Sequence, residues 1–169
     1  VTLLRMQERM WGQQGGRMRA IIVLAGLAMA ASWALTWLEP PFAGPEVSPM
    51  ALMRDGVLAL SSEAPWQSWV FVGGFVAAAL AVLAAVAGRA AGIFALLAGL
   101  SPLVVLGDAV IRAEEMRRDL GLPVAVDFGD LARSWVLLQD FVRAGVWAYS
   151  GGALLLLVAG ATVLLAPRR

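Results

Sequence analysis

Residues 69–107 read WVFVGGFVAAALAVLAAVAGRAAGIFALLAGLSPLVVLG, a run of 39 residues that contains a single charged side chain, Arg89. A helix of roughly 20 apolar residues crosses the hydrocarbon core of a bilayer. The stretch on each side of Arg89 is close to that length, so the sequence predicts two membrane spans, at residues 69–88 and 90–107. So short a connection places the two helices side by side and antiparallel.

Two further apolar stretches flank this pair, at residues 20–38 and 144–167. Each of them is also long enough, or nearly so, to cross a bilayer as a helix. We therefore expect an all-α integral membrane protein whose single domain is a bundle of four transmembrane helices.

The composition excludes several classes of protein. Hydrophobic residues make up 60% of the chain and charged residues only 15%, whereas about a quarter of the residues of a soluble domain are charged. A soluble enzyme or a nucleic-acid-binding protein is therefore not expected. The chain has no Cys and no His, which removes the usual zinc and haem ligands and the commonest general base. We expect no cofactor and no metal ion.

The arginines predict the orientation of the bundle. With both termini in the cytoplasm, the inner segments carry seven Arg against one acid, Glu8, and the outer segments carry six Arg against eleven acids. An excess of arginine in short cytoplasmic segments sets membrane topology. The Arg-rich composition without Lys or Asn is typical of a GC-rich genome, and we expect a multi-pass protein of a bacterial cytoplasmic membrane.

Residues 1–19 predict an amphipathic helix on the inner leaflet. Leu3, Leu4, Met6, Met10 and Trp11 alternate there with arginines and glutamines, a pattern typical of helices that lie at the membrane interface. The pair at residues 15–16, both glycine, is expected to act as a hinge before the first span. The alternative is a frayed terminus.

The loop at residues 39–68 is rich in Pro and Gly. Ser48 followed by Pro49 predicts the start of a short helix, because serine caps helices and proline suits their first position. Trp66 and Trp69 are expected to mark the return to the membrane, as interfacial tryptophans do. Trp33 and Trp37 are assigned the same role at the exit of the first span.

Residues 108–143 predict a helical protrusion outside the membrane, between the third and fourth spans. Nothing interrupts the helical pattern before Gly121 and Pro123, so the third span is expected to continue beyond the bilayer up to that stop signal. Asp130 is then expected to cap a second helix, at residues 131–145, which leads into the fourth span.

Small residues recur at four-residue spacing on three of the predicted spans. Such ladders allow helices to approach closely in lipid, and we expect them to form the internal contacts of the bundle. The residues assigned to helix packing are Gly73, Ala77, Ala81, Ala95, Gly99, Ala148 and Gly152.

The polar residues give little indication of a catalytic, ion-transport or metal site. Ser32, Thr36, Ser101, Ser150 and Thr162 are expected to bond to carbonyl groups of their own helices. No charged residue lies near the middle of a span, which argues against an ion pump, because such residues mark ion pathways. The acids between residues 108 and 130 alternate with arginines at spacings typical of ion pairs on a helix surface. A metal site there is the less favoured alternative.

The leading functional hypothesis is a non-catalytic accessory or scaffolding subunit of a larger integral membrane complex, respiratory, photosynthetic or transport-related. In length and number of spans the chain resembles small membrane subunits of transport and respiratory assemblies, including the small subunit of TRAP transporters, without a specific shared motif. Expected partners are other membrane subunits and lipids, and not nucleic acid. Candidate contacts with partners are Met10, Trp11, Trp66, Trp69, Trp135 and Phe141. The alternatives are a transporter subunit that scaffolds the substrate-carrying partner and, more remotely, a lipid enzyme that uses the external carboxylates.

Overall fold

The computed structural model describes residues 2–39, 46–58, 60–119 and 142–165, and within these ranges all regular secondary structure is helical. Four long helices are present: α1 (Thr2–Ala31), α3 (Trp66–Val86), α4 (Gly92–Asp119) and α6 (Ala144–Leu165). A short helix, α2 (Pro49–Arg54), lies in the loop between α1 and α3. The helical class expected from the sequence is confirmed.

Three of these helices contain segments long and apolar enough to cross a membrane. These segments are Trp66–Val86, Gly92–Arg112 and Ala144–Leu165, of 21, 21 and 22 residues. At 1.5 Å per residue each is about 32 Å long, which matches the hydrocarbon thickness of a bilayer. The described part of the chain therefore has the character of a membrane protein.

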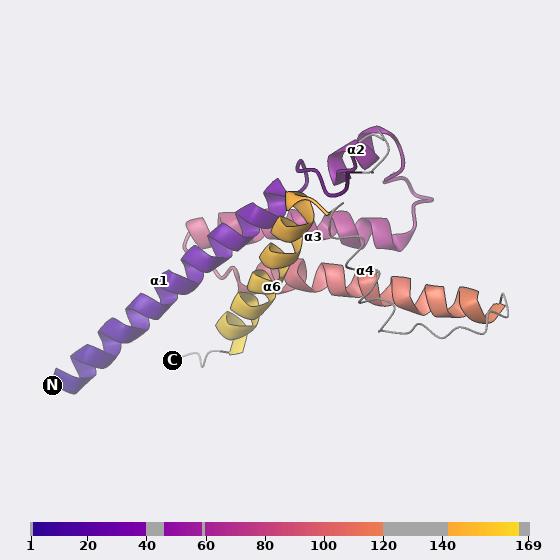
Figure 1. Ribbon diagram of the computed structural model, residues 1–169. Coiled ribbons are helices and arrows are strands. Elements are labelled where there is room, and N and C mark those ends of the chain that lie inside the picture. The colour runs from indigo at the N-terminus through magenta and orange to yellow at the C-terminus, as the bar shows by residue number, and fades with distance from the viewer. Residues whose placement is uncertain (1, 40–45, 59, 120–141, 166–169) are drawn as a thin grey trace.

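The four long helices form a ring of contacts. Helix α1 packs against α3 and α6, and α4 packs against the same two helices on the other side. The first residues of α1, the last turn of α6 and the α3–α4 connection lie at one end of the bundle, and α2 and the C-terminal half of α4 lie at the opposite end (Figure 1). We call these the turn end and the loop end.

A glycine fixes the tight turn between α3 and α4. Gly88 has a φ of 69°, a left-handed conformation that costs glycine little. The amide of Gly88 donates to the carbonyl of Ala85 (3.2 Å), and the amide of Arg89 donates to the carbonyl of Ala84 (2.8 Å). This pattern is the Schellman motif, which satisfies the last carbonyl groups of a helix.

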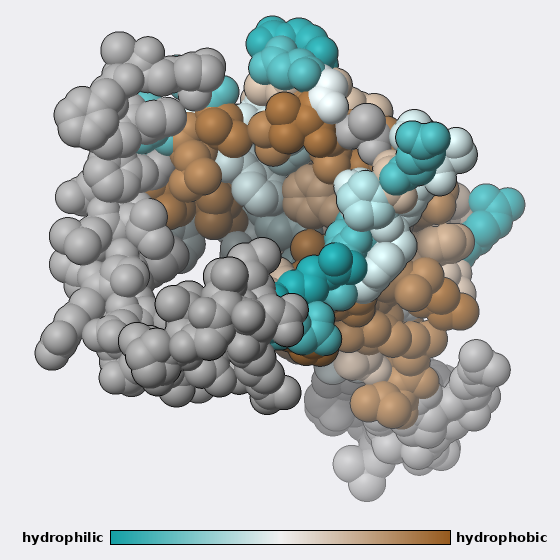
Figure 2. All heavy atoms as spheres, turned by 90° about the vertical axis from the view of Figure 1, so that its right-hand side faces the viewer, coloured by the Kyte–Doolittle hydropathy of each residue, from teal (hydrophilic) through white to brown (hydrophobic). Residues whose placement is uncertain are grey.

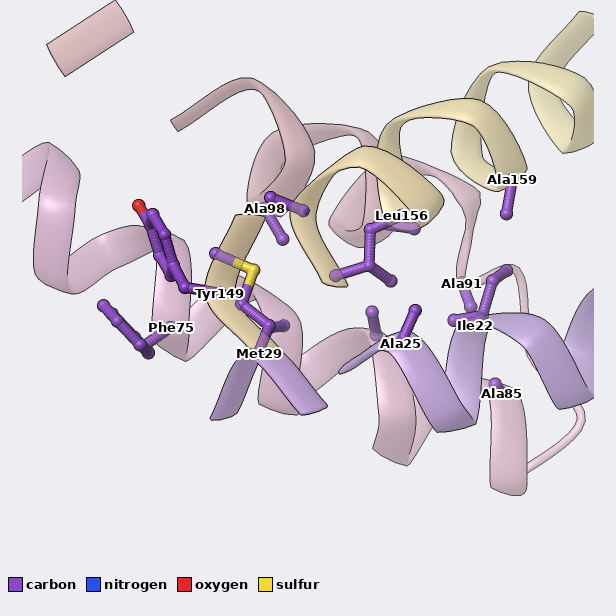
Figure 3. Packing of buried hydrophobic residues seen from close by; sticks show 14 residues of the cluster. Ile22, Ala25, Met29, Phe75, Ala85, Ala91, Ala98, Tyr149, Leu156 and Ala159 are labelled. Carbon is purple, nitrogen blue, oxygen red and sulfur yellow. The ribbon is translucent and has the colours of Figure 1, made fainter. Parts of the chain in front are cut away.

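The core of the bundle is built mainly from alanine. Ala78, Ala81, Ala95 and Ala98 are completely buried, and Leu156 and Met29 fill the space between the helices (Figure 3). Ile22, Ala25 and Met29 place the second half of α1 inside this core. In lipid, side chains this small let helix backbones approach and gain van der Waals contact.

Glycines lie at the closest helix crossings. A Cβ atom added at Gly99 would lie 2.5 Å from the amide nitrogen of Leu157, and one added at Gly160 would lie 2.6 Å from that of Leu96. A Cβ atom at Gly152 would lie 2.8 Å from the carbonyl oxygen of Ala25. Since real Cβ atoms do not approach backbone atoms so closely, the α4–α6 and α1–α6 contacts require glycine at these positions.

The small residues of α3 match the predicted ladder only in part. Ala81 is buried in the core, as predicted. Gly73 is exposed, with no atom within 4 Å of an added Cβ, whereas Gly74 faces Ser101 of α4. The buried positions are Gly74, Phe75, Ala78, Ala81 and Ala85. A strict four-residue ladder advances about 40° around the helix at each step, because one turn takes 3.6 residues. The contact therefore alternates spacings of four and three.

Helix α4 continues through Pro102. Proline has no amide proton, so the carbonyl group of Ala98, four residues earlier, loses its usual helix donor. The Ser101 hydroxyl donates to that carbonyl at 2.9 Å and compensates for the loss.

Two boundaries predicted for the first helix are wrong. Residues 15 and 16 form no hinge, because α1 is one helix from Thr2 to Ala31. The helix also stops well before residue 38. At that point the Ser32 hydroxyl donates to the carbonyl of Met29 (2.6 Å), and the Trp37 indole donates to the carbonyl of Ser32 (2.8 Å). Side chains therefore take carbonyl groups that a continuing helix would use.

The two residues before α6, 142 and 143, are not helical, contrary to the prediction. Val142 forms an isolated bridge with Leu38, and the helix begins at Ala144. A helix over residues 131–145 that leads directly into α6 is therefore wrong at its C-terminal end. Its cap, Asp130, and the turn at residues 121–129 lie outside the described residues.

Candidate functional site at the loop end

Five aromatic rings form a cluster at the loop end of the bundle. This aromatic cluster consists of Trp33, Trp37, Phe71, Phe75 and Tyr149. The Tyr149 ring stacks on Phe75 with centroids 5.2 Å apart, and the two lie side by side in Figure 3. Its centroid lies 4.8 Å from that of Trp37 and 5.9 Å from that of Phe71. Tyr149 thus contacts three of the other four rings.

Three parts of the chain supply these rings. Phe71 and Phe75 are four residues apart on α3 and so share one face of that helix, with centroids 5.3 Å apart. Trp33 and Trp37 come from the turn that follows α1, and Tyr149 comes from α6. Ring pairs of this geometry contribute about 0.5–1.5 kcal/mol each beyond the area they bury. The cluster therefore joins α1, α3 and α6.

Backbone pairing holds the segment after α1 over the start of α6. The amide of Trp37 donates to the carbonyl of Val47 (2.8 Å), and the amide of Arg143 donates to the carbonyl of Trp37 (2.9 Å). Leu38 accordingly forms bridges with both Val47 and Val142. The Arg143 side chain adds a 2.6 Å ion pair with Glu39. These contacts tie the loop between α1 and α3 to the N-terminus of α6.

A polar group links α3 to α4 at the same end. The Gln67 side-chain amide donates to Asp108 Oδ2 at 2.6 Å, and Arg112 Nε donates to the same oxygen at 2.7 Å. This polar triad of Gln67, Asp108 and Arg112 leaves Gln67 Oε1 buried without a hydrogen-bond partner among the described residues. Since Asp108 is already engaged by a cation and an amide, the arrangement locks two helices together.

Three of the five predicted hydroxyl groups bond to carbonyl groups as expected. Ser32, Ser101 and Thr162 donate to carbonyl groups three residues earlier, at 2.6, 2.9 and 2.8 Å. Thr36 instead donates to Glu46 at 2.6 Å, because it lies in the turn after α1 and not inside a helix. Ser150 is exposed on α6.

The predicted partner contacts are distributed over the molecule. Trp66 and Trp69 lie at the start of α3 with about half of their surface exposed, 46% and 50%. Residues 10 and 11 lie in the first half of α1, where the structure describes the backbone. Trp135 and Phe141 lie outside the described residues. Of the remaining predicted packing residues, Ala77 is half-buried on α3 and Ala148 is half-buried on α6.

The loop end carries several exposed apolar side chains, which we call the apolar rim: Trp66, Trp69, Met50, Met53 and Val57. Met50 and Met53 belong to α2, and Val57 comes after it. Figure 2 looks at the molecule from the side to which α4 extends and shows apolar and polar side chains interspersed there. Ser48 caps α2 by accepting from the amide of Ala51 at 3.1 Å, so the positions of the methionines are fixed by a defined helix.

The aromatic cluster was not predicted from the sequence. Trp33 and Trp37 were assigned to the membrane interface, and no role was assigned to Phe71, Phe75 or Tyr149. A signal was present, because both the tryptophans and the phenylalanines are spaced four residues apart and flank the same predicted loop. Among the described residues no group of three or more acidic side chains is placed to hold a metal ion.

No protein-family model, curated protein or solved structure matches this chain. We therefore infer its function from the geometry of the bundle and its two ends.

Proposed function

We propose that this chain is a non-catalytic accessory or scaffolding subunit of a larger integral membrane complex. The observation that carries the proposal is the unequal length of the helices. Helices α1 and α4 have 30 and 28 residues, against 21 and 22 for α3 and α6. At 1.5 Å per residue the longer pair spans about 42–45 Å, which exceeds the roughly 30 Å of bilayer hydrocarbon.

The two extra lengths project from opposite ends of the bundle. At the turn end the first half of α1 extends beyond the α3–α4 connection, and at the loop end the last turns of α4 extend beyond the start of α3 (Figure 1). The α1 extension carries Met10 and Trp11, and the loop end carries the apolar rim with Trp66 and Trp69. A protein with helical surfaces beyond both membrane boundaries can contact membrane partners on both sides.

The proposal includes a fourth span by α1, with both termini in the cytoplasm. Residues 20–31 of α1 are apolar, and one face of this segment, with Ile22, Ala25 and Met29, packs in the core against α3 and α6. Arg17, Arg19 and Arg89 belong to the turn end and form no ion pair among the described side chains. The described arginines of the loop end are each paired with an acid: Arg54 with Asp55, Arg112 with Asp108 and Arg143 with Glu39. This charge asymmetry favours a cytoplasmic turn end under the positive-inside rule, in a bacterial inner membrane.

The proposal predicts stoichiometric co-purification with other membrane subunits. The protein is extracted from native membranes under gentle conditions, and the complex is sized and analysed by mass spectrometry. We expect partner subunits at fixed stoichiometry, and their identity distinguishes a transporter from a respiratory or photosynthetic assembly. Recovery of the chain alone, as a 17.8 kDa monomer or a homo-oligomer, would overturn the proposal.

Paired variants locate the contact. Met10→Ser with Trp11→Ser changes the α1 extension, and Trp66→Ser with Trp69→Ser changes the apolar rim. At least one pair should lower partner recovery severalfold with an unchanged melting temperature. Leu154→Ser with Leu155→Ser, both exposed on the middle of α6, is the matched control for loss of exposed apolar surface. If only this control pair lowers recovery, the partners bind the lipid-facing side and the two projections are not the contact surfaces.

A further inference from the structure

We propose that the turn end holds the phosphate headgroup of an anionic phospholipid between Arg19 and Arg89. This inference rests on the proposed placement of the turn end at the membrane surface. It does not depend on any partner subunit.

Arg19 belongs to α1, and Arg89 belongs to the α3–α4 turn beside which the Arg19 side chain lies. Arg19 Nη1 lies 3.9 Å from the point that a Cβ atom would occupy at Gly88, the residue before Arg89. At the same end, the Thr162 hydroxyl lies 3.8 Å from Met18 Sδ. The packing of α1 against both α3 and α6 therefore holds Arg19 beside the α3–α4 turn.

These arginines have no counter-charge in the described part of the chain. Arg17, Arg19 and Arg89 are exposed and take part in none of the ion pairs between described side chains. Glu8, the single acid on the N-terminal side of α1, is eleven residues from Arg19, about 16 Å farther along the helix. Three guanidinium groups thus share one end of the bundle with a positive charge that the described fold leaves unneutralised.

The end of α3 does not need the arginine side chains. A guanidinium near a helix C-terminus commonly bonds to the last carbonyl groups. Here the carbonyls of Leu83, Ala84 and Ala85 already accept the amides of Ala87, Arg89 and Gly88, at 2.9, 2.8 and 3.2 Å. The guanidinium groups therefore keep their donors for an external anion.

The position and chemistry of the site favour a lipid headgroup. The apolar segments of α3 and α4 end at this turn, so the arginines lie at the depth where a bilayer has its phosphate groups. Guanidinium binds phosphate oxygens through paired hydrogen bonds. Basic pockets between transmembrane helices on the cytoplasmic side recognise anionic headgroups.

The test compares the purified protein in nanodiscs of phosphatidylglycerol with the protein in nanodiscs of phosphatidylcholine, by melting temperature and by native mass spectrometry of retained lipid. For the wild type we expect a higher melting temperature in phosphatidylglycerol and retained anionic lipid. Arg19→Gln with Arg89→Gln should weaken retention about thirtyfold, from the contribution of two arginines near an anionic surface.

A matched pair of substitutions removes the same charge from the loop end. Arg54→Gln with Arg143→Gln should keep the response to phosphatidylglycerol. If this pair loses the response equally, the effect is general electrostatics and the site is refuted. Unchanged retention in the Arg19 and Arg89 pair also refutes it. If that pair does not fold, Arg89→Gln alone is compared with Arg54→Gln alone on the same terms.

A soluble phosphate is the competing source of the same chemistry. Inorganic phosphate and glycerol 3-phosphate are therefore added to the wild type in phosphatidylcholine. We expect no rise in melting temperature, because the lipid is also held by its acyl chains. A rise that matches that seen in phosphatidylglycerol would overturn the assignment to lipid. Since partner recovery is not measured here, failure of this test is distinct from failure of the proposed function.

Discussion

Gly152→Leu should strongly destabilise the helix bundle, and Gly151→Leu should leave its stability nearly unchanged. Gly152 faces α1, where an added Cβ atom would lie 2.8 Å from the carbonyl oxygen of Ala25 and 3.0 Å from the amide nitrogen of Met29. Backbone atoms of a packed helix cannot yield locally, so α1 must separate from α6. Overpacking a core costs about 1–3 kcal/mol and sometimes more, and we expect the upper end or beyond.

The neighbouring glycine provides the control for this prediction. Gly151 is exposed, with no atom within 4 Å of an added Cβ. Within a helix, leucine is also more favourable than glycine by about 0.8 kcal/mol of intrinsic helix propensity. Thermal unfolding in detergent, followed by tryptophan fluorescence, measures both variants. Equal melting temperatures for the two variants would show that α1 does not pack against α6 as described.

Tyr149→Ala should also strongly lower the stability of the folded protein. Tyr149 is 7% exposed and contacts Trp37, Phe71 and Phe75. Removing a buried aromatic side chain costs about 3–5 kcal/mol, which corresponds to a melting temperature lower by roughly ten degrees in a chain of this size. The loss should also loosen the segment after α1, since Trp37 belongs to both the cluster and the paired loop.

Tyr149→Phe separates the ring from its hydroxyl group. The hydroxyl oxygen is buried and makes no hydrogen bond of good geometry among the described residues, although Ser101 of α4 lies beside it. A buried polar atom that is poorly paired destabilises the folded state. Phenylalanine should therefore leave the melting temperature unchanged or raise it. If Tyr149→Phe lowers it as much as Tyr149→Ala does, the hydroxyl has an essential partner and the stacking account is incorrect.

Hydropathy and length were sufficient to predict the helical class and the three apolar segments. The tight connection at Gly88 and Arg89 followed from a single charge inside a long apolar run. These features depend on the local sequence and on the thickness of the bilayer, which is why they can be read without tertiary information. The Ser48–Pro49 pair likewise marks the start of α2, since capping is a local effect.

The features that sequence reasoning missed depend on tertiary contacts. The end of α1 at Ala31 is set by Trp37, whose indole reaches back to the carbonyl of Ser32. Hydropathy cannot detect this bond, because residues 32–38 remain mostly apolar. Trp37 looked like an interfacial anchor for the same reason, since its partners Phe71 and Tyr149 are distant in sequence.

The register of the α3 ladder also required the structure. Residues 73 and 74 are both glycine, so the sequence does not distinguish them. In the structure only Gly74 faces Ser101 of α4 and lies in the α3–α4 contact. On α4 and α6 the predicted Gly99 and Gly152 do lie at close crossings.

We propose a four-span protein whose turn end faces the cytoplasm, and single-cysteine labelling tests this topology most directly. The chain has no cysteine of its own, so each introduced thiol reports one position. Gly16, Ser62 and Ala90 are exposed and are replaced one at a time by cysteine. In intact cells a membrane-impermeant maleimide should label Ser62→Cys alone, and Gly16→Cys and Ala90→Cys should react only after permeabilisation. Labelling of Gly16→Cys together with Ser62→Cys in intact cells would show that α1 does not cross the membrane, and the reverse pattern would invert the orientation.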